Sequence, residues 1–153
     1  VVIDQLYKET PGWVRVDPNT HHYMDTYGRI RLFHGVNVVF KTPPFIPEAQ
    51  RWDVEVSFNA QDAANLQKWG FNVIRLGVLW AGTFPAAPGI PDAAYMKAVK
   101  RIVKHCKTHG IHVVIDFHTD VLSRRFCGNG MPDWAVDLSL GAMGQQPPYG
   151  DFP

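Results

Sequence analysis

The stretch IHVVIDFHTD, residues 111–120, decides the fold. Its first half, up to Ile115, is an unbroken apolar run, which is typical of a strand buried on both faces of a parallel sheet. Its second half places Asp116, His118 and Asp120 at alternate positions, so these three side chains share one face of the strand. Ligands of parallel α/β folds bind at the carboxyl ends of the strands. The polar residues at the carboxyl end of this strand therefore predict the floor of a binding pocket.

Two further strands precede this one, and a helix follows each of them. Strands are predicted over 31–40 and 71–80, and helices over 59–70 and 92–109. Asn59 suits a helix N-cap, and each helix closes on a glycine, as helices commonly do. The alternation of strand and helix predicts a parallel sheet with right-handed crossovers and the helices outside.

The two ends of the chain have a different character. Residues 1–30 predict a short β-hairpin with a turn at 17–20, and residues 31–153 then hold three βα units. Within the second part, residues 121–153 are rich in Gly and Pro and predict loops, with one short helix near Trp134. An open segment of three strands would expose the edge of the third strand.

Composition excludes several classes of function. With 153 residues, of which 46% are hydrophobic and 19% charged, the chain has the size of one globular domain. The net charge of +1 gives no overall electrostatic footprint for nucleic acid or an anionic membrane. No apolar run approaches the ~20 residues of a membrane span. The start at Val1, without Met or a signal peptide, indicates a processed or trimmed N-terminus.

Polar or aromatic residues mark the ends of all three predicted strands. The first strand has Asn37 and, just beyond its end, Lys41; the second has Arg75 and Trp80; the third has Asp116, His118 and Asp120. A structural Arg–Asp ion pair and a satisfied core histidine are the alternatives for single members of this set. Three exits of the same character favour a binding pocket.

Motifs for cofactors and metals are weak or absent. No glycine-rich nucleotide-binding motif and no G-x-S-x-G elbow occurs, so no cofactor is predicted. Candidate metal ligands are scattered pairs without a third ligand at a suitable spacing: His21 with His22, His105 with His109, and His118 with Asp120. No metal site is predicted, and the histidines of the second pair are expected to be solvated.

Three stretches together resemble the endoglycoceramidase-related branch of glycoside hydrolase family 5. They are RLFHGVNVVFKTPPFIP (31–47), WGFNVIRLGVLWAGTFP (69–85) and GIHVVIDFHTDVLSRRFCGNGMPDWA (110–135). The resemblance covers about residues 10–136, and its looser family-wide marks are Gly35-x-Asn37, Asn72-x-x-Arg75 and Asp116-x-His118. It implies a (β/α)₈ TIM barrel, of which this chain would be the N-terminal part, about three βα units.

The resemblance also implies retaining chemistry by two Glu residues, one after an Asn at the end of strand four and one at the end of strand seven. Only Glu9, Glu48 and Glu55 occur here, none after an Asn or at the end of a buried strand. A barrel needs about 250 residues. The acid/base and the nucleophile are therefore expected outside this chain, on the remainder of the barrel in the same precursor or a second chain.

For the residues present, the resemblance implies supporting roles. Arg75 would position and ionise the nucleophile, and His118 would bind a sugar hydroxyl near the cleaved bond. The implied substrate-binding residues are Asn37, Lys41, Asp120 and Trp134.

The function implied is hydrolysis of the β-glycosidic bond of a glycolipid such as a glycosphingolipid, in a secreted or lysosome- or vacuole-like location, with transient membrane-surface contact. A sterol or other β-glucosidase or glucanase of the same family, or a non-catalytic sugar- or lipid-binding barrel, are the alternatives.

Two expectations concern other side chains. Cys106 and Cys127 would lie at opposite ends of the barrel, about 20 Å apart, too far for the ~7 Å that a disulfide allows between Cα atoms. The loop with Phe40, Phe45 and Ile46 either forms an apolar slot for a lipid tail or packs on its own barrel.

Overall fold

The computed structural model describes residues 12–144, which fall into two compact units. The first unit ends at His34, and within it β1 (Val14–Val16) pairs antiparallel with β2 (Tyr23–Asp25). The hairpin predicted at the N-terminus is confirmed. Its second strand ends on Asp25, whose carboxylate accepts hydrogen bonds from the backbone N–H of Tyr27 and of Arg29.

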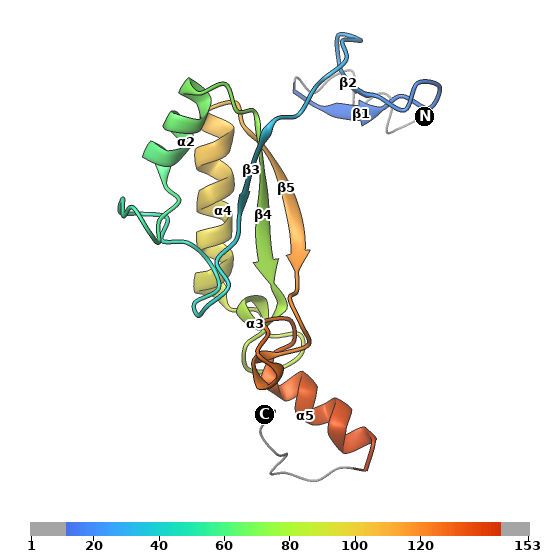
Figure 1. The fold of residues 1–153 in the computed structure, drawn as a ribbon, viewed down its shortest axis with the longest axis vertical. Coiled ribbons are helices and arrows are strands. Elements are labelled where there is room, and N and C mark those ends of the chain that lie inside the picture. The colour runs from blue at the N-terminus through green and yellow to red at the C-terminus, as the bar shows by residue number, and fades with distance from the viewer. Residues whose placement is uncertain (1–11, 145–153) are drawn as a thin grey trace. The chain divides into compact units, whose positions relative to one another are not determined.

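The second unit, from residue 35 onward, contains a parallel sheet of three strands. In the order of the sheet these are β3 (Gly35–Val38), β4 (Val73–Leu79) and β5 (His112–His118). Figure 1 shows α2 (Ala60–Lys68) and α4 (Ala93–Thr108) side by side on one face of this sheet. The predicted alternation of strand and helix is confirmed. The first strand is shorter than the predicted 31–40, because only residues 35–38 pair with β4.

Local capping explains where the two long helices begin. The Asn59 side chain accepts from Gln61 N at 2.8 Å, and the Asp62 carboxylate accepts from Asn59 N at 2.9 Å, which is a complete capping box. The Asp92 carboxylate accepts from Tyr95 N in the same way at the start of α4. Both helices are followed by a glycine with positive φ, as predicted: Gly70 (84°) and Gly110 (67°).

The hydrophobic core lies between the sheet and the two helices. Its fully buried members include Ile74, Leu76 and Ile102. Trp69, the C-cap residue of α2, is 65% exposed. It lines an open groove beside β3, the outer edge of the sheet, so no described segment covers the ring.

The prediction that the apolar run up to Ile115 is buried on both faces of the sheet is wrong for its last two residues. Val114 and Ile115 are exposed, and Phe117 is 85% exposed. The reason is topological: β5 is an edge strand in the described part of the chain, and α4 packs against only its first residues. The strand has the composition of a central strand but lacks a neighbour on one side.

Short helices follow the strands at their carboxyl ends. They are α3 (Trp80–Thr83), the 3₁₀ helix η1 (Arg124–Phe126) and α5 (Asp133–Ala142). The sequence predicted only a short helix near Trp134, and α5 is longer than that, whereas α3 was not predicted. Within residues 12–144, no helix has both the length and the apolar character needed to cross a membrane.

Tyr95, on α4, forms hydrogen bonds with two other segments near the carboxyl ends of the strands. Its hydroxyl accepts from Leu79 N at 2.9 Å and donates to Phe45 O at 3.2 Å. Gly82 lies directly against the ring, because a Cβ there would be 2.4 Å from a ring carbon. Burial raises the pKa of Tyr95, so the phenol keeps its proton and can donate.

We expect Tyr95→Phe to lower the free energy of unfolding by about 1–3 kcal/mol, because a buried N–H and a carbonyl lose their partner. Chemical denaturation measures the change. Tyr27→Phe is the matched control, since Tyr27 is exposed and its ring stays in place. Equal midpoints for the two variants would show that the hydroxyl does not fasten these segments.

The two cysteines differ in environment and are both free thiols. Burial raises the pKa of the Cys106 thiol to about 11, whereas Cys127 is exposed. We expect a maleimide to label Cys127 and leave Cys106 unmodified until the protein is denatured, as read by peptide mass spectrometry. Comparable labelling of both in the native protein, or a link between them, would contradict this structure.

Candidate active site

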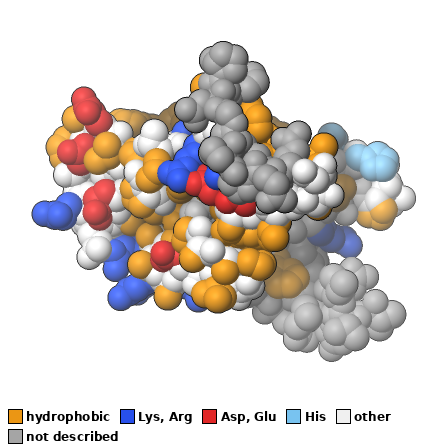
Figure 2. All heavy atoms as spheres, turned by 90° about the horizontal axis from the view of Figure 1, so that it is seen from below, with side chains coloured by type: hydrophobic (Ala, Val, Ile, Leu, Met, Phe, Trp, Pro, Cys, Tyr) orange, Lys and Arg blue, Asp and Glu red, His pale blue; other side chains and the backbone are white. Residues whose placement is uncertain are grey.

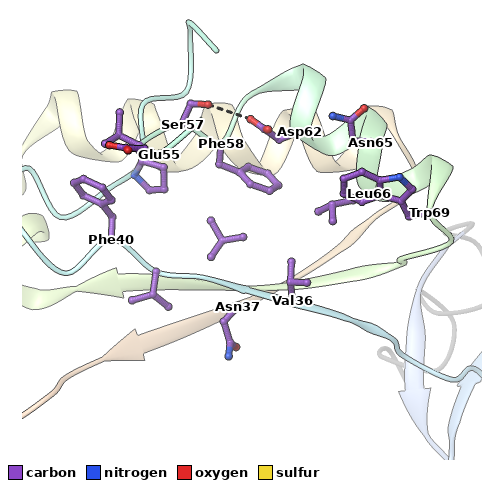
Figure 3. A pocket seen from close by; sticks show the side chains of 14 residues that line it. Val36, Asn37, Phe40, Glu55, Ser57, Phe58, Asp62, Asn65, Leu66 and Trp69 are labelled. Atoms are coloured by element: carbon purple, nitrogen blue, oxygen red, sulfur yellow. Dashed lines mark hydrogen bonds between the residues drawn. The ribbon is translucent and has the colours of Figure 1, made fainter. Parts of the chain in front are cut away.

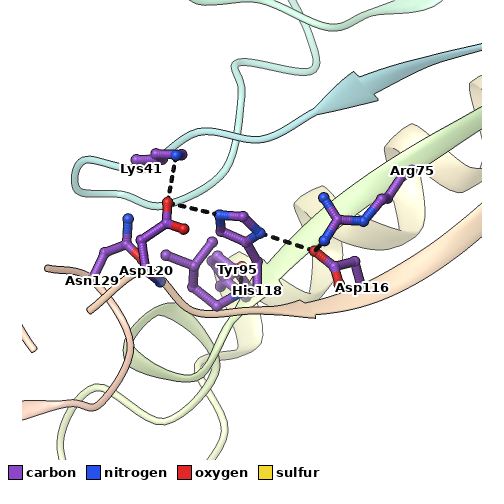
Figure 4. A network of polar contacts seen from close by, with 8 residues as sticks. Lys41, Arg75, Tyr95, Asp116, His118, Asp120 and Asn129 are labelled. Atoms are coloured by element: carbon purple, nitrogen blue, oxygen red, sulfur yellow. Dashed lines mark hydrogen bonds and ion pairs between the residues drawn. The ribbon is translucent and has the colours of Figure 1, made fainter. Parts of the chain in front are cut away.

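A continuous polar network joins the exits of the three strands (Figure 4). Arg75 Nη2 lies 2.7 Å from Asp116 Oδ2, and the same oxygen lies 2.9 Å from His118 Nδ1. The other ring nitrogen, His118 Nε2, lies 3.1 Å from Asp120 Oδ2. Lys41, which follows β3, forms an ion pair with that same carboxylate. The structure thus brings four of the six predicted site residues into one chain of contacts.

The register of the sheet produces this arrangement. Arg75 on β4 pairs with Val114, so Asp116 lies one side-chain step further along the same face of β5. Gly77 pairs with Asp116 and carries no side chain, and the Val39 side chain occupies that space, since a Cβ at Gly77 would lie 2.9 Å from it. Asn37 pairs with Arg75, and Figure 3 shows it pointing away from α2, so it belongs to the face of the network. Its substrate-binding role stays a prediction.

His118 occupies the centre of the network and is largely buried. Whether each ring nitrogen donates or accepts in these contacts depends on the tautomer of the imidazole. The contacts of both carboxylates use the Oδ2 atom. The other oxygens, Asp116 Oδ1 and Asp120 Oδ1, have no partner within residues 12–144. Both oxygens are acceptors available to a ligand.

The charge around Asp120 shifts its pKa. Its hydrogen bond with Lys41, and secondly the one with His118, lower the pKa of this carboxyl below its usual value. The side chain is nevertheless 43% exposed. Asp120 is therefore an ionised acceptor at the surface of the site over a wider pH range than an isolated aspartate.

Asn129, which the sequence did not single out, holds the backbone of Asp120. The side-chain oxygen of Asn129 accepts a hydrogen bond from Asp120 N at 3.0 Å, and the backbone N–H of Asn129 donates to Asp120 O at 2.9 Å. The side chain is 7% exposed. Val121, the residue after Asp120, has φ 55°, which is strained for a β-branched residue. The signal in the sequence is the pair of glycines around Asn129: a Cβ at Gly128 would lie 2.3 Å from Asp120 O.

Trp134 is held apart from the network. Its Nε1 donates to Phe84 O at 2.7 Å, and its ring meets Trp80 edge to face with centroids 5.6 Å apart. Neither a hydrogen bond nor an ion pair joins it to the network in the part of the chain that the structure describes. Contact with a sugar stays a prediction for this residue.

The loop with Phe45 and Ile46 packs largely on its own unit. Ile46 is buried in the core and Phe45 packs against it. Ile46 is only 6% exposed, so its lipid-binding role stays a prediction. A cavity of about 670 Å³ lies beside this loop, between it and the helices α3 and α4, and Phe40, Phe45 and Ile46 all line it.

The described glutamates lie away from the network. Glu48 accepts from Gln50 N at 2.6 Å in the loop before α2, and Glu55 belongs to the same loop. Figure 3 shows Glu55 at one end of a groove of about 330 Å³ between β3 and α2, on the helix side of the sheet. Glu9 lies outside the described residues.

Metal binding finds no support in the described ranges. No group of three or more His, Cys, Asp or Glu side chains there could hold a metal ion. His105 and His109 are both partly exposed, and each also has a hydrogen-bond partner. His105 Nε2 lies 3.1 Å from Ala49 O, and His109 Nδ1 lies 3.0 Å from Gln67 Oε1, so both tie α4 to preceding segments.

Known proteins share this chain's sequence and fold. The family model of cellulase, glycosyl hydrolase family 5, matches residues 35–147. An endoglycoceramidase of Hydra vulgaris is 41% identical over 129 residues, which is 84% of this chain and 25% of that protein. An endoglycoceramidase of Cyanea nozakii is 40% identical over 124 residues, which is 81% of this chain and 24% of that protein.

A solved structure of sterylglucosidase 1 of Cryptococcus neoformans has a TM-score of 0.69 and 28% identity, and the match covers 90% of this chain and 21% of that one. The chain spans about a quarter of the length of the curated relatives it matches.

We expect Lys41→Met to raise the pKa of Asp120 toward its ordinary value, because the largest cause of the lowering is removed. Titration of the Asp120 carboxyl ¹³C shift measures this. Since the folded-state pKa is lowered, the stability that the Lys41 contact contributes is present above the ordinary carboxyl pKa and is lost as pH falls through the folded one. Lys68→Met, on α2, is the control, and an unchanged Asp120 titration in Lys41→Met would contradict the assignment.

Proposed function

This chain belongs to glycosyl hydrolase family 5, in the branch that contains endoglycoceramidases, and from this membership we propose that it is the N-terminal part of a retaining hydrolase acting on the β-glycosidic bond of a glycolipid. The observation that carries the proposal is the network of Lys41, Asp120, His118, Asp116 and Arg75 at the strand exits. It lies where ligands of parallel α/β folds bind. Its exposed donors and acceptors suit the hydroxyl groups of a sugar.

Each part of the network has a chemical task in this proposal. Retaining hydrolysis needs two carboxyl groups about 5 Å apart, one as nucleophile and one as acid/base. The Arg75 guanidinium, fixed by Asp116, would keep a neighbouring carboxylate ionised and ready to attack. His118 is held by Asp116 and Asp120 through its two ring nitrogens, and it would hydrogen-bond a sugar hydroxyl near the cleaved bond by exchanging one of these contacts for the sugar.

The adjacent sugar would be bound by the outer pair. Lys41 offers ammonium protons, and Asp120 offers the oxygen Oδ1 that neither Lys41 nor His118 uses. We place the nucleophile and the acid/base outside these 153 residues. The support for this is that neither described glutamate joins the network.

The lipid-linked substrate is supported by the names of the relatives, endoglycoceramidase for two proteins and sterylglucosidase for the solved structure. A sterol glucoside is the second candidate, favoured by the structural likeness over 90% of this chain. A non-catalytic sugar-binding barrel is the third, favoured by the position of the glutamates. The first two candidates differ in the lipid or sterol part of the substrate that the protein hydrolyses. Hydrolysis of either substrate distinguishes both of them from the third candidate, which binds without hydrolysis.

The test uses the complete protein that contains this chain. We expect turnover of a glycosphingolipid or steryl glucoside by the complete protein and none by the 153-residue chain alone. Asp120→Ala should lower kcat/KM by about 10- to 100-fold, the loss of hydrogen bonds to a charged group. Asp17→Ala, on the hairpin, is the control.

Turnover by the isolated chain above a heat-inactivated sample would overturn the placement of the two carboxylates. An unaffected Asp120→Ala enzyme would overturn the site itself. Binding of glycolipid without hydrolysis by the complete protein would leave the third candidate.

A further inference from the structure

Helix α4 concentrates basic charge on its outer face. Its buried face is formed by Tyr95, Val99, Ile102 and Cys106. At 100° per residue, four lysines fall within about a quarter of the helix circumference, opposite that face. We call them the lysine strip: Lys97, Lys100, Lys104 and Lys107. Helices form the outer ring of a (β/α)₈ barrel, so a face turned away from the sheet points outward there as well.

The positive charge of the lysine strip is not neutralised by acidic residues of the same helix. All four side chains are exposed, and α4 contains no acidic residue. Neighbouring members are three or four residues apart, the spacing at which like charges destabilise a helix. No ion pair joins any of them to an acidic side chain within residues 12–144. The net charge of +1 for the whole chain conceals this local excess.

An uncharged apolar loop lies at the N-terminal end of the lysine strip. Residues 84–91, FPAAPGIP, join α3 to α4 and include Ile90, which is 64% exposed. The loop is at the strand exits, because Trp134 Nε1 binds Phe84 O. Figure 2, which views this end of the molecule, shows exposed hydrophobic side chains interspersed with acidic and basic ones.

We propose that the lysine strip and loop 84–91 dock the protein on an anionic membrane surface. Lysines near an anionic leaflet are attracted to it, and exposed apolar side chains enter the boundary between headgroups and acyl chains, so the two features together suit a lipid surface. An acidic protein or a nucleic acid would use the lysines but not the uncharged loop. The inference rests on the proposed function only in that a lipid-linked substrate lies in such a surface.

The geometry gives the docking a direction. Lys97 and Lys100 lie next to loop 84–91, whereas Lys107 lies ten residues, or about 15 Å, further along the helix. The Debye length in physiological salt is about 8 Å. With the loop in contact with the surface, the two N-terminal lysines contribute most of the attraction, and the strand exits are held close to the lipid.

Vesicle cosedimentation of the complete protein tests the proposal, with phosphatidylcholine vesicles that contain or lack phosphatidylserine and carry no glycolipid. We expect binding only to the anionic vesicles, and a decrease on adding salt. Lys97→Gln with Lys100→Gln should weaken the partition by about 25-fold, at about five-fold per lysine. Ile90→Ser should weaken it as well.

The matched control is Lys68→Gln with Lys107→Gln, which removes the same charge from the last turns of α2 and α4. It should weaken binding by less than five-fold. Equal losses in the two double variants, or no preference for anionic vesicles, would overturn the proposal, as would an Ile90→Ser variant that binds like the wild type.

Turnover of a soluble aryl glucoside, measured in parallel, should be the same in all variants. A wild type that binds vesicles but hydrolyses nothing would refute the proposed function and leave the docking surface in place. A wild type that hydrolyses but does not bind would do the reverse.

Discussion

The parallel register of β3, β4 and β5 is the constraint on which the candidate site depends. It places Asn37 beside Arg75 and Gly77 beside Asp116, so polar side chains from separate strands share one face. Tyr95 then fastens the end of β4 to the loop after β3. A slip of one residue in this register would turn the polar set of one strand toward the helices and break every contact of the network.

Apart from His118, the formal charges of the network cancel before any ligand binds. Two cations, Lys41 and Arg75, face two carboxylates, Asp116 and Asp120, with His118 between them. Such balance lets the side chains adopt their positions without a sugar, and the strained backbone at Val121 is held by Asn129. Preorganisation of this kind reduces the ordering that a substrate must otherwise impose.

Patterns local in sequence predicted most of the fold. The caps at Asn59 and Asp92 fixed the helix starts, and the alternation after Ile115 placed three members of the network. Contacts distant in sequence were not predictable. Tyr95 reaches Phe45 and Trp134 reaches Phe84, each across 50 residues, and no local pattern reports such pairs. The burial of Ile46 and the role of Asn129 depend on the same kind of contact, and the exposure of Phe117 depends on a neighbour that β5 lacks.

The uncovered edge of β5 has a consequence for biosynthesis. A chain leaves the ribosome N-terminus first, at about 5–20 residues per second, so in a longer barrel this sheet would precede its remaining strands by tens of seconds. During that interval the unpaired backbone of β5 and the side chains of Val114 and Phe117 face the surrounding solvent. An edge of this kind is a template for pairing with another nascent chain. Aggregation of the nascent chain is therefore expected to be greatest in this interval, and a low concentration of nascent chains would reduce it.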